Sequence, residues 1–136
     1  MSMPLTLPVS FGEAADKLTI LQIKKERIRD PAKLANVETE LAQVSERFFA
    51  ATGNSPGLDA LLAALKRVNE RLWDLEEAVR EHERRGDFGA DFVRIAREIY
   101  FTNDERARAK RELDVLLNSP IMEEKSYIQH SVRGGG

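Results

Sequence analysis

The sequence predicts an all-α fold, an antiparallel four-helix bundle in which the third and fourth helices form a long hairpin. Apolar residues recur at steps of three and four through most of the chain, which places them on one face of a helix. Capping residues, prolines and glycines stand at the few points where these seams stop. With 136 residues, the chain can bury one core without disulfides or metal, so we expect a single domain.

The first helix is expected to follow an extended lead-in, residues 1–9. This lead-in contains two prolines, which disfavour a helix, and it can lie along the bundle. Ser10 and Glu13 form a capping box, in which the hydroxyl and the carboxylate both satisfy free amides at a helix start. From there the helix should run to about Arg29.

The first helix is apolar on two sides. Ile20 and Ile23 lie nearly opposite its main apolar face. The main face consists of Ala14, Leu18, Leu21 and Ile28. A helix with two apolar sides is usually covered on both, so we expect one of two arrangements. Either the helix lies between the hairpin and another element, such as the N-terminal segment, or its second side forms a homodimer contact.

The second helix is expected to begin at Asp30 and Pro31 and to end at Gly53. Aspartate caps free amides, and proline is favoured at the first helical position. A single narrow stripe of apolar residues should face a partner helix. The stripe is Leu34, Val37, Leu41, Val44 and Phe48.

The third and fourth helices carry the longest seams. After a turn at residues 54–57, the third helix should run from Leu58 to Arg85, on the order of 40 Å, and therefore needs an equally long neighbour. Gly86 is expected to close it, and Asp87 to cap the fourth helix, which should stop at residues 118–120. The seams are Leu58, Leu61, Leu65, Val68, Leu72, Leu75 and Val79, then Phe92, Ile95, Ile99, Thr102, Arg106, Ala109, Leu113 and Leu116. The bundle domain is thus residues 10–118, followed by a polar, loosely held tail, residues 119–136.

Polar residues interrupt the seam in the middle of the fourth helix. Thr102 and Arg106 stand at seam positions, and Asn103 and Lys110 lie beside them. In a hairpin that turns near Gly86, Asn103 falls level with Asn69 of the third helix, and Arg106 comes near it. Further polar candidates are Trp73, Glu76 and Arg80 on the third helix and Asp16, Lys24 and Arg27 on the first.

These polar residues admit two interpretations. In the first, they form a pocket inside the bundle, where Arg106 and Lys110, with Arg80 or Arg27, hold an anion and Glu76 or Asp16 acts as an acid or base. In the second, they form an ion-pair and amide network that sets the helix register. The second is favoured, because charges in long helical hairpins more often organise pairing than bind ligands.

Several classes of function find no support in the sequence. Twenty-one Lys and Arg face 23 Asp and Glu, so no net charge favours nucleic acid or an anionic membrane. The absence of cysteine fits a reducing cytoplasm, and no export signal or membrane-spanning run is visible. The two histidines, His82 and His130, lie outside any metal-binding pattern, so we expect no metal and no cofactor. No nucleophile motif is present.

Short strings spread over nearly the whole chain resemble an uncharacterised bacterial family of small helical proteins. The strings are PVSFGE, DKLTIL, LANV, LWDLE, IYFTND, KREL and EEKSY. The resemblance implies that EEKSY, residues 123–127, belongs to the domain and packs back on the bundle. The family carries no assigned activity, so the resemblance implies no catalytic residue.

Two functions are therefore expected from the sequence. The favoured one is a helical binding or assembly module, with a possible homodimer through the first helix. The alternative is a binding protein or enzyme for an anionic small molecule, with its pocket inside the bundle.

Overall fold

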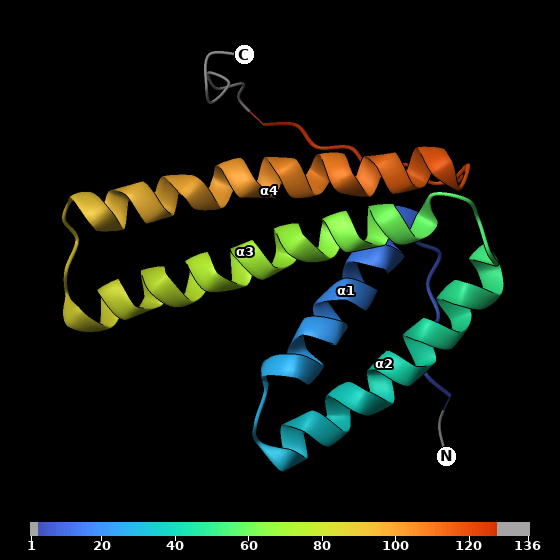
Figure 1. Ribbon diagram of the computed structural model, residues 1–136, viewed down its shortest axis with the longest axis horizontal. Coiled ribbons are helices and arrows are strands. Elements are labelled where there is room, and N and C mark those ends of the chain that lie inside the picture. The colour runs from blue at the N-terminus through green and yellow to red at the C-terminus, as the bar shows by residue number, and fades with distance from the viewer. Residues whose placement is uncertain (1–2, 128–136) are drawn as a thin grey trace.

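A computed structural model of the chain describes residues 3–127 and contains four helices. These are α1 (Phe11–Arg27), α2 (Pro31–Thr52), α3 (Leu58–Arg85) and α4 (Ala90–Leu116). Figure 1 shows two antiparallel hairpins, α1–α2 and α3–α4, which meet near one end and diverge from there. The predicted all-α four-helix bundle with a long α3–α4 hairpin is confirmed.

Helix α1 is the element that joins the two hairpins. It packs against α2 on one side and against both α3 and α4 on the other. Ile23, on the second apolar side, is buried with 1% of its surface exposed, and Ile20 is half-buried. Of the two expected arrangements, the structure therefore has the one in which α1 lies between the hairpin and another element.

That other element is not the N-terminal segment. Its apolar side chains are turned to solvent, with Met3 and Leu5 each 84% exposed, Leu7 65% and Val9 51%. The segment is extended, as expected, but the expectation that it covers the second side of α1 is wrong. Helix α2 packs against α1, whereas Ile20 on the second apolar side lines a hollow together with residues of α3 and α4.

The main core lies where α1, the start of α3 and the end of α4 meet. Leu18, Leu65 and Leu113 contribute fully buried side chains from these three helices. Phe48, near the end of α2, completes the same cluster. The core is therefore concentrated at one end of the long hairpin.

The helix ends follow most of the predicted capping residues. Asp30 accepts a hydrogen bond from the Lys33 amide at 2.9 Å, and Gly86 closes α3 in the left-handed conformation, φ 66°. Asp87 was expected to cap α4, but it does not. Its own amide donates to the His82 carbonyl at 2.9 Å and so completes the end of α3, while α4 begins at Ala90.

The last described residues turn back along α4. Asn118 takes a left-handed conformation, φ 51°, and the Ser119 amide donates to the Asp114 carbonyl at 2.8 Å. This is a Schellman closure with asparagine in the usual place of glycine. Residues 119–127 then run beside α4 without regular structure (Figure 1). The rest of the expected tail, including His130, lies outside the described residues.

The part of the α3–α4 hairpin beyond α1 projects as a two-helix arm. Arg27, the last residue of α1, pairs with Asp74 at 2.6 Å. We call the following portion of the hairpin, residues 75–100, the arm. Figure 1 shows no other helix alongside it. No helix in the described part of the chain is long and apolar enough to cross a membrane.

Candidate functional site

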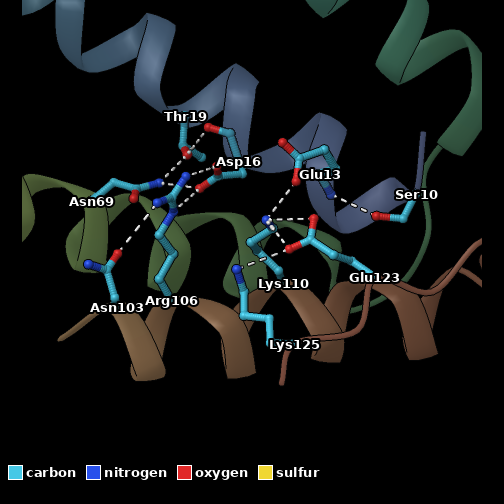
Figure 2. A network of polar contacts seen from close by, with 10 residues as sticks. All are labelled: Ser10, Glu13, Asp16, Thr19, Asn69, Asn103, Arg106, Lys110, Glu123 and Lys125. Atoms are coloured by element: carbon cyan, nitrogen blue, oxygen red, sulfur yellow. Dashed lines mark hydrogen bonds and ion pairs between the residues drawn. The ribbon is translucent and has the colours of Figure 1, made fainter. Parts of the chain in front are cut away.

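The buried carboxylate of Asp16 joins three helices. Asp16 lies on α1, and its side chain is only 3% exposed. Arg106 of α4 binds both carboxylate oxygens, with Nε at 2.9 Å from Oδ1 and Nη2 in close contact with Oδ2. The Nδ2 of Asn69, on α3, donates to Oδ1 at 2.9 Å (Figure 2). Sequence reasoning named all three residues, and the structure brings them together.

Thr19 is a fourth member that the sequence analysis missed. Its hydroxyl accepts a hydrogen bond from Asn69 Nδ2 at 3.0 Å and donates to the Asp16 carbonyl at 2.9 Å. Thr19 is 1% exposed. The available signal was its position three residues after Asp16, which places both on one face of α1.

The charges of Asp16 and Arg106 compensate each other within this network. The hydrogen bond with Asp16 raises the pKa of Arg106 further above its ordinary value and outweighs the effect of burial. A bidentate guanidinium and an amide together satisfy both oxygens of Asp16. The arrangement is therefore that of a structural ion pair, in which the cation is already neutralised.

A second charged cluster lies one turn along α1 and α4. The Lys110 ammonium donates to Glu13 at 2.6 Å and lies 3.4 Å from both carboxylate oxygens of Glu123 in the tail. Lys125 lies 3.3 Å from Glu123 (Figure 2). Glu13 was expected to complete the capping box. The Ser10 hydroxyl does accept from the Glu13 amide at 3.1 Å, but the Glu13 carboxylate binds Lys110 instead.

Opposing effects act on the pKa values in this second cluster. Burial lowers the pKa of Lys110, but the hydrogen bond with Glu13 and the charges of Asp16, Glu13 and Glu123 outweigh it and raise the pKa. A hydrogen bond with Glu13, together with Lys110 and Lys125, lowers the pKa of Glu123 to about 2. Lys110 is thus a charged ammonium held between Glu13 and Glu123.

Gly12 sets how closely α1 approaches α4. A Cβ atom at this position would lie 2.3 Å from the Lys110 carbonyl oxygen. The Gly12 amide donates to Asp114 Oδ1 at 2.6 Å, and the Phe11 amide donates to Ser119 Oγ at 3.3 Å. This contact fixes the start of α1 on α4 and so places Glu13 and Asp16 opposite Lys110 and Arg106. The sequence analysis missed both Gly12 and Asp114.

The other predicted site residues lie outside the two charged clusters. Trp73 Nε1 donates to Glu77 at 2.9 Å, and the Arg80 Nε lies 3.8 Å from Glu76. Arg27 pairs with Asp74 and lies over the Trp73 ring, 5.7 Å from its centroid. Lys24 takes no part in the hydrogen bonds around Asp16. Asn103 touches the network at its edge, where it accepts from Arg106 Nη1 at 3.5 Å.

Thr102 is the predicted seam residue with the least expected environment. It is fully buried, and its hydroxyl oxygen has no hydrogen-bond partner among the described residues. An unsatisfied buried hydroxyl costs roughly 1–3 kcal/mol. Nothing in the structure explains why a hydroxyl stands there.

A groove at the base of the arm is the first of two open hollows beside Arg106. It has a volume of about 470 Å³. We call it the arm groove. Ile20 of α1 and Leu72 of α3 line it. Six predicted site residues also line it: Asn69, Trp73, Glu76, Arg80, Asn103 and Arg106.

The second hollow lies between α4 and the tail. It has a volume of about 610 Å³, and we call it the tail groove. Asn103 and Arg106 line both grooves. The charged lining of the tail groove is balanced, with Arg106, Lys110 and Lys125 against Glu13, Asp104 and Glu123. In either groove an anion would meet Arg106, which already binds the Asp16 carboxylate. Within residues 3–127, no three metal-ligating side chains gather in a cluster that could hold a metal ion.

No family model, curated protein or solved structure matches this chain. The family resemblance of its short strings therefore stays a prediction.

Proposed function

We propose that this protein is a helical binding and assembly module that associates with a second copy of itself through the arm groove. The observation that carries the proposal is a difference between the charged and the apolar side chains of the site. The central cation, Arg106, is paired with Asp16 within the chain, whereas Ile20 and Trp73 in the arm groove are only half-buried. A surface of this kind favours an uncharged polypeptide over an anion.

The arm itself supports association. Leu75, Val79 and Ile99 are only half-buried between two helices, and Phe88 and Val93 are 53% and 51% exposed. Long helical hairpins usually bury such residues against a third or fourth helix. In this chain α1 covers only the base of the hairpin, so a second copy can supply the missing cover.

The expected homodimer through the first helix fits this proposal in a changed form. The two sides of α1 are occupied by α2 and by the α3–α4 hairpin, but Ile20 still lines the arm groove. A partner in that groove would therefore touch α1 at Ile20 and α3 at Trp73 together. Self-association through α1 alone would have no comparable surface.

The charges at the site give less support to the alternative function, a site for an anionic metabolite. A bound anion would have to compete with Asp16 for Arg106, or with Glu13 and Glu123 for Lys110. Such competition lowers affinity by the free energy of the ion pair that is broken.

Sedimentation of the full chain over a wide range of concentrations tests the proposal. We expect the mean mass to rise from 15.4 kDa towards twice that value, and Trp73→Ala to weaken this rise. Val115→Ala serves as the matched control, because Val115 is an exposed apolar residue on α4 outside the arm groove.

A mass that stays at 15.4 kDa at every concentration would overturn the proposed function. A thermal unfolding midpoint that rises saturably with inorganic phosphate, a nucleotide or a sugar phosphate in wild type, but not in Arg106→Leu, would favour the anion site instead.

A further inference from the structure

We infer that the N-terminal segment of one copy, residues 3–9, lies in the arm groove of a second copy. The inference rests on the proposed self-association and names the part of the partner that fills the groove. Because both copies carry a segment and a groove, the two contacts would be identical and would close a two-fold dimer.

The segment is built like a ligand that is already extended. Met3, Leu5, Leu7 and Val9 alternate along it, and each has at least half of its surface exposed. The next residue, Ser10, is 3% exposed and caps α1. The segment therefore leaves a fixed anchor on the bundle and presents a row of apolar side chains to solvent.

Two prolines lower the cost of binding this segment. Pro4 and Pro8 hold their own φ angles near the polyproline value and favour an extended conformation in the residues before them. Less backbone entropy is then lost on docking. Both prolines also lack an amide hydrogen, so the segment is poorly suited to add to a sheet and better suited to bind through its side chains.

The arm groove fits such a segment in chemistry. Extended proline-containing peptides bind in grooves lined by aromatic side chains, and Trp73 with Leu72 and Ile20 supplies an apolar lining. Residues 3–9 carry no charged side chain, and the charged side chains that line the groove balance in number, with Arg80 and Arg106 against Glu76 and Glu77. The amide nitrogen of Asn103, whose oxygen accepts from Arg106, can donate to a carbonyl of the segment.

The groove fits the segment in length as well. From Asn69 to Arg80, the α3 edge of the groove extends over about 16 Å at ~1.5 Å per residue. An extended segment of residues 3–9 spans about 20 Å at ~3 Å per residue. The segment can therefore follow the whole edge of the groove.

The arrangement in the chain favours exchange between copies. Figure 1 shows the segment leaving the start of α1 and passing α2, away from the arm. The arm groove is lined by Ile20 of α1 and by residues of α3 and α4, and by none of residues 3–9. A second copy can present its segment there without any change in the helices.

The first test uses a synthetic peptide of residues 3–9 and the double variant Leu5→Asp/Leu7→Asp. This variant keeps its groove but carries a charged segment, and both leucines are exposed, so its fold should be unchanged. Trp73 is the only tryptophan of the chain and lines the groove, so its emission reports occupancy directly. We expect a saturable blue shift with the peptide and none with a peptide that has aspartate at both leucine positions.

The second test is complementation between two variants. Leu5→Asp/Leu7→Asp alone should dimerise at least about tenfold more weakly than wild type, and so should Trp73→Ala alone. An equal mixture should associate more strongly than either variant, because one intact segment then meets one intact groove. Ile121→Asp, which charges an exposed tail residue, is the matched control and should behave as wild type.

The outcomes separate the two proposals. If wild type dimerises and Leu5→Asp/Leu7→Asp dimerises equally well, the segment is not the occupant, and the proposed function survives without this inference. The same holds if wild type dimerises but the peptide leaves Trp73 emission unchanged. If wild type stays monomeric, both proposals fail.

Discussion

Asp16 determines the register of α1 on the α3–α4 hairpin. It is a charged group inside an otherwise apolar contact, and its donors come from α3 and α4 at one height of the bundle. A buried carboxylate costs several kcal/mol unless such donors compensate it. A shift of α1 by one turn would separate Asp16 from both Asn69 and Arg106, so the network selects one alignment.

Replacing Arg106 should therefore destabilise the protein. Arg106→Leu leaves the Asp16 carboxylate buried without its cation. We expect the free energy of unfolding to fall by roughly 2–4 kcal/mol, somewhat less than for a fully enclosed pair, because the Arg106 side chain is 31% exposed. Urea unfolding near neutral pH measures the change.

Two further variants make that measurement specific. Arg108→Leu, an exposed arginine on the same helix, should change the free energy of unfolding by about 0.5 kcal/mol or less. Asp16→Leu in the Arg106→Leu background should recover part of the loss, because no unpaired charge then remains. Equal stability of Arg106→Leu and wild type would refute a structural role for the ion pair.

A substitution at Thr102 should increase the stability of the protein rather than lower it. Thr102→Val replaces an unpaired buried hydroxyl with a methyl group of similar shape, so we expect stability to rise by about 1 kcal/mol. Thr39→Val is the control, because the Thr39 hydroxyl is exposed and donates to the Ala35 carbonyl at 3.0 Å. A destabilised Thr102→Val would mean that the hydroxyl has a partner after all. Thermal unfolding of wild type, Thr102→Val and Thr39→Val measures these differences in stability.

Between elements, the contact of α1 with α4 depends on the missing side chain of Gly12. Gly12→Ala should cost about 2 kcal/mol or more, even though alanine favours a helix, because the new Cβ meets the backbone carbonyl of Lys110. Gly89→Ala is a matched control. Its Cβ would lie 3.5 Å from Asp87 Oδ1, an ordinary contact, so its stability should stay close to that of wild type. A neutral Gly12→Ala in urea unfolding would contradict the close approach.

The tail contact on α4 should depend on pH. The pKa of Glu123 falls from 4.5 to about 2 on folding, so between these values the unfolded chain binds a proton that the folded chain does not. The stability that Glu123 contributes is therefore complete above pH of about 4.5 and is lost as the pH falls towards 2. In Glu123→Gln this contribution is absent.

A pH series of thermal unfolding checks the tail contact. Between pH of about 6 and about 3, the midpoint of wild type should fall further than that of Glu123→Gln. Glu124→Gln is the control, since Glu124 is 75% exposed and lies 3.3 Å from Arg111 at the surface. Equal pH dependence of Glu123→Gln and wild type would show that Glu123 is not held by Glu13 and Lys110.

At the scale of the whole molecule, the sequence predicted where the helices lie along the chain. It predicted less well how the helices pack across one another. The seams predicted the start of α3 at Leu58 and its end at Arg85, because each seam is a local repeat. The divergence of the two hairpins depends instead on Gly12 and Asp114, which are 102 residues apart. Their pairing leaves no periodic signal. Asp16 was recognisable as a charge near an apolar face, whereas the role of Thr19 appears only when Asn69 lies beside it.

The uneven placement of the core predicts uneven local stability. Amide hydrogen exchange should be slowest around Leu65 and Leu113, where three helices meet, and faster in the arm, residues 75–100, which only two helices form. Raising the protein concentration should slow exchange at the base of the arm and in residues 3–9, while residues 31–47 on α2 serve as the internal control. Uniform protection along α3 would contradict a projecting arm. Protection of the arm base without protection of residues 3–9 would mean that another surface covers the groove.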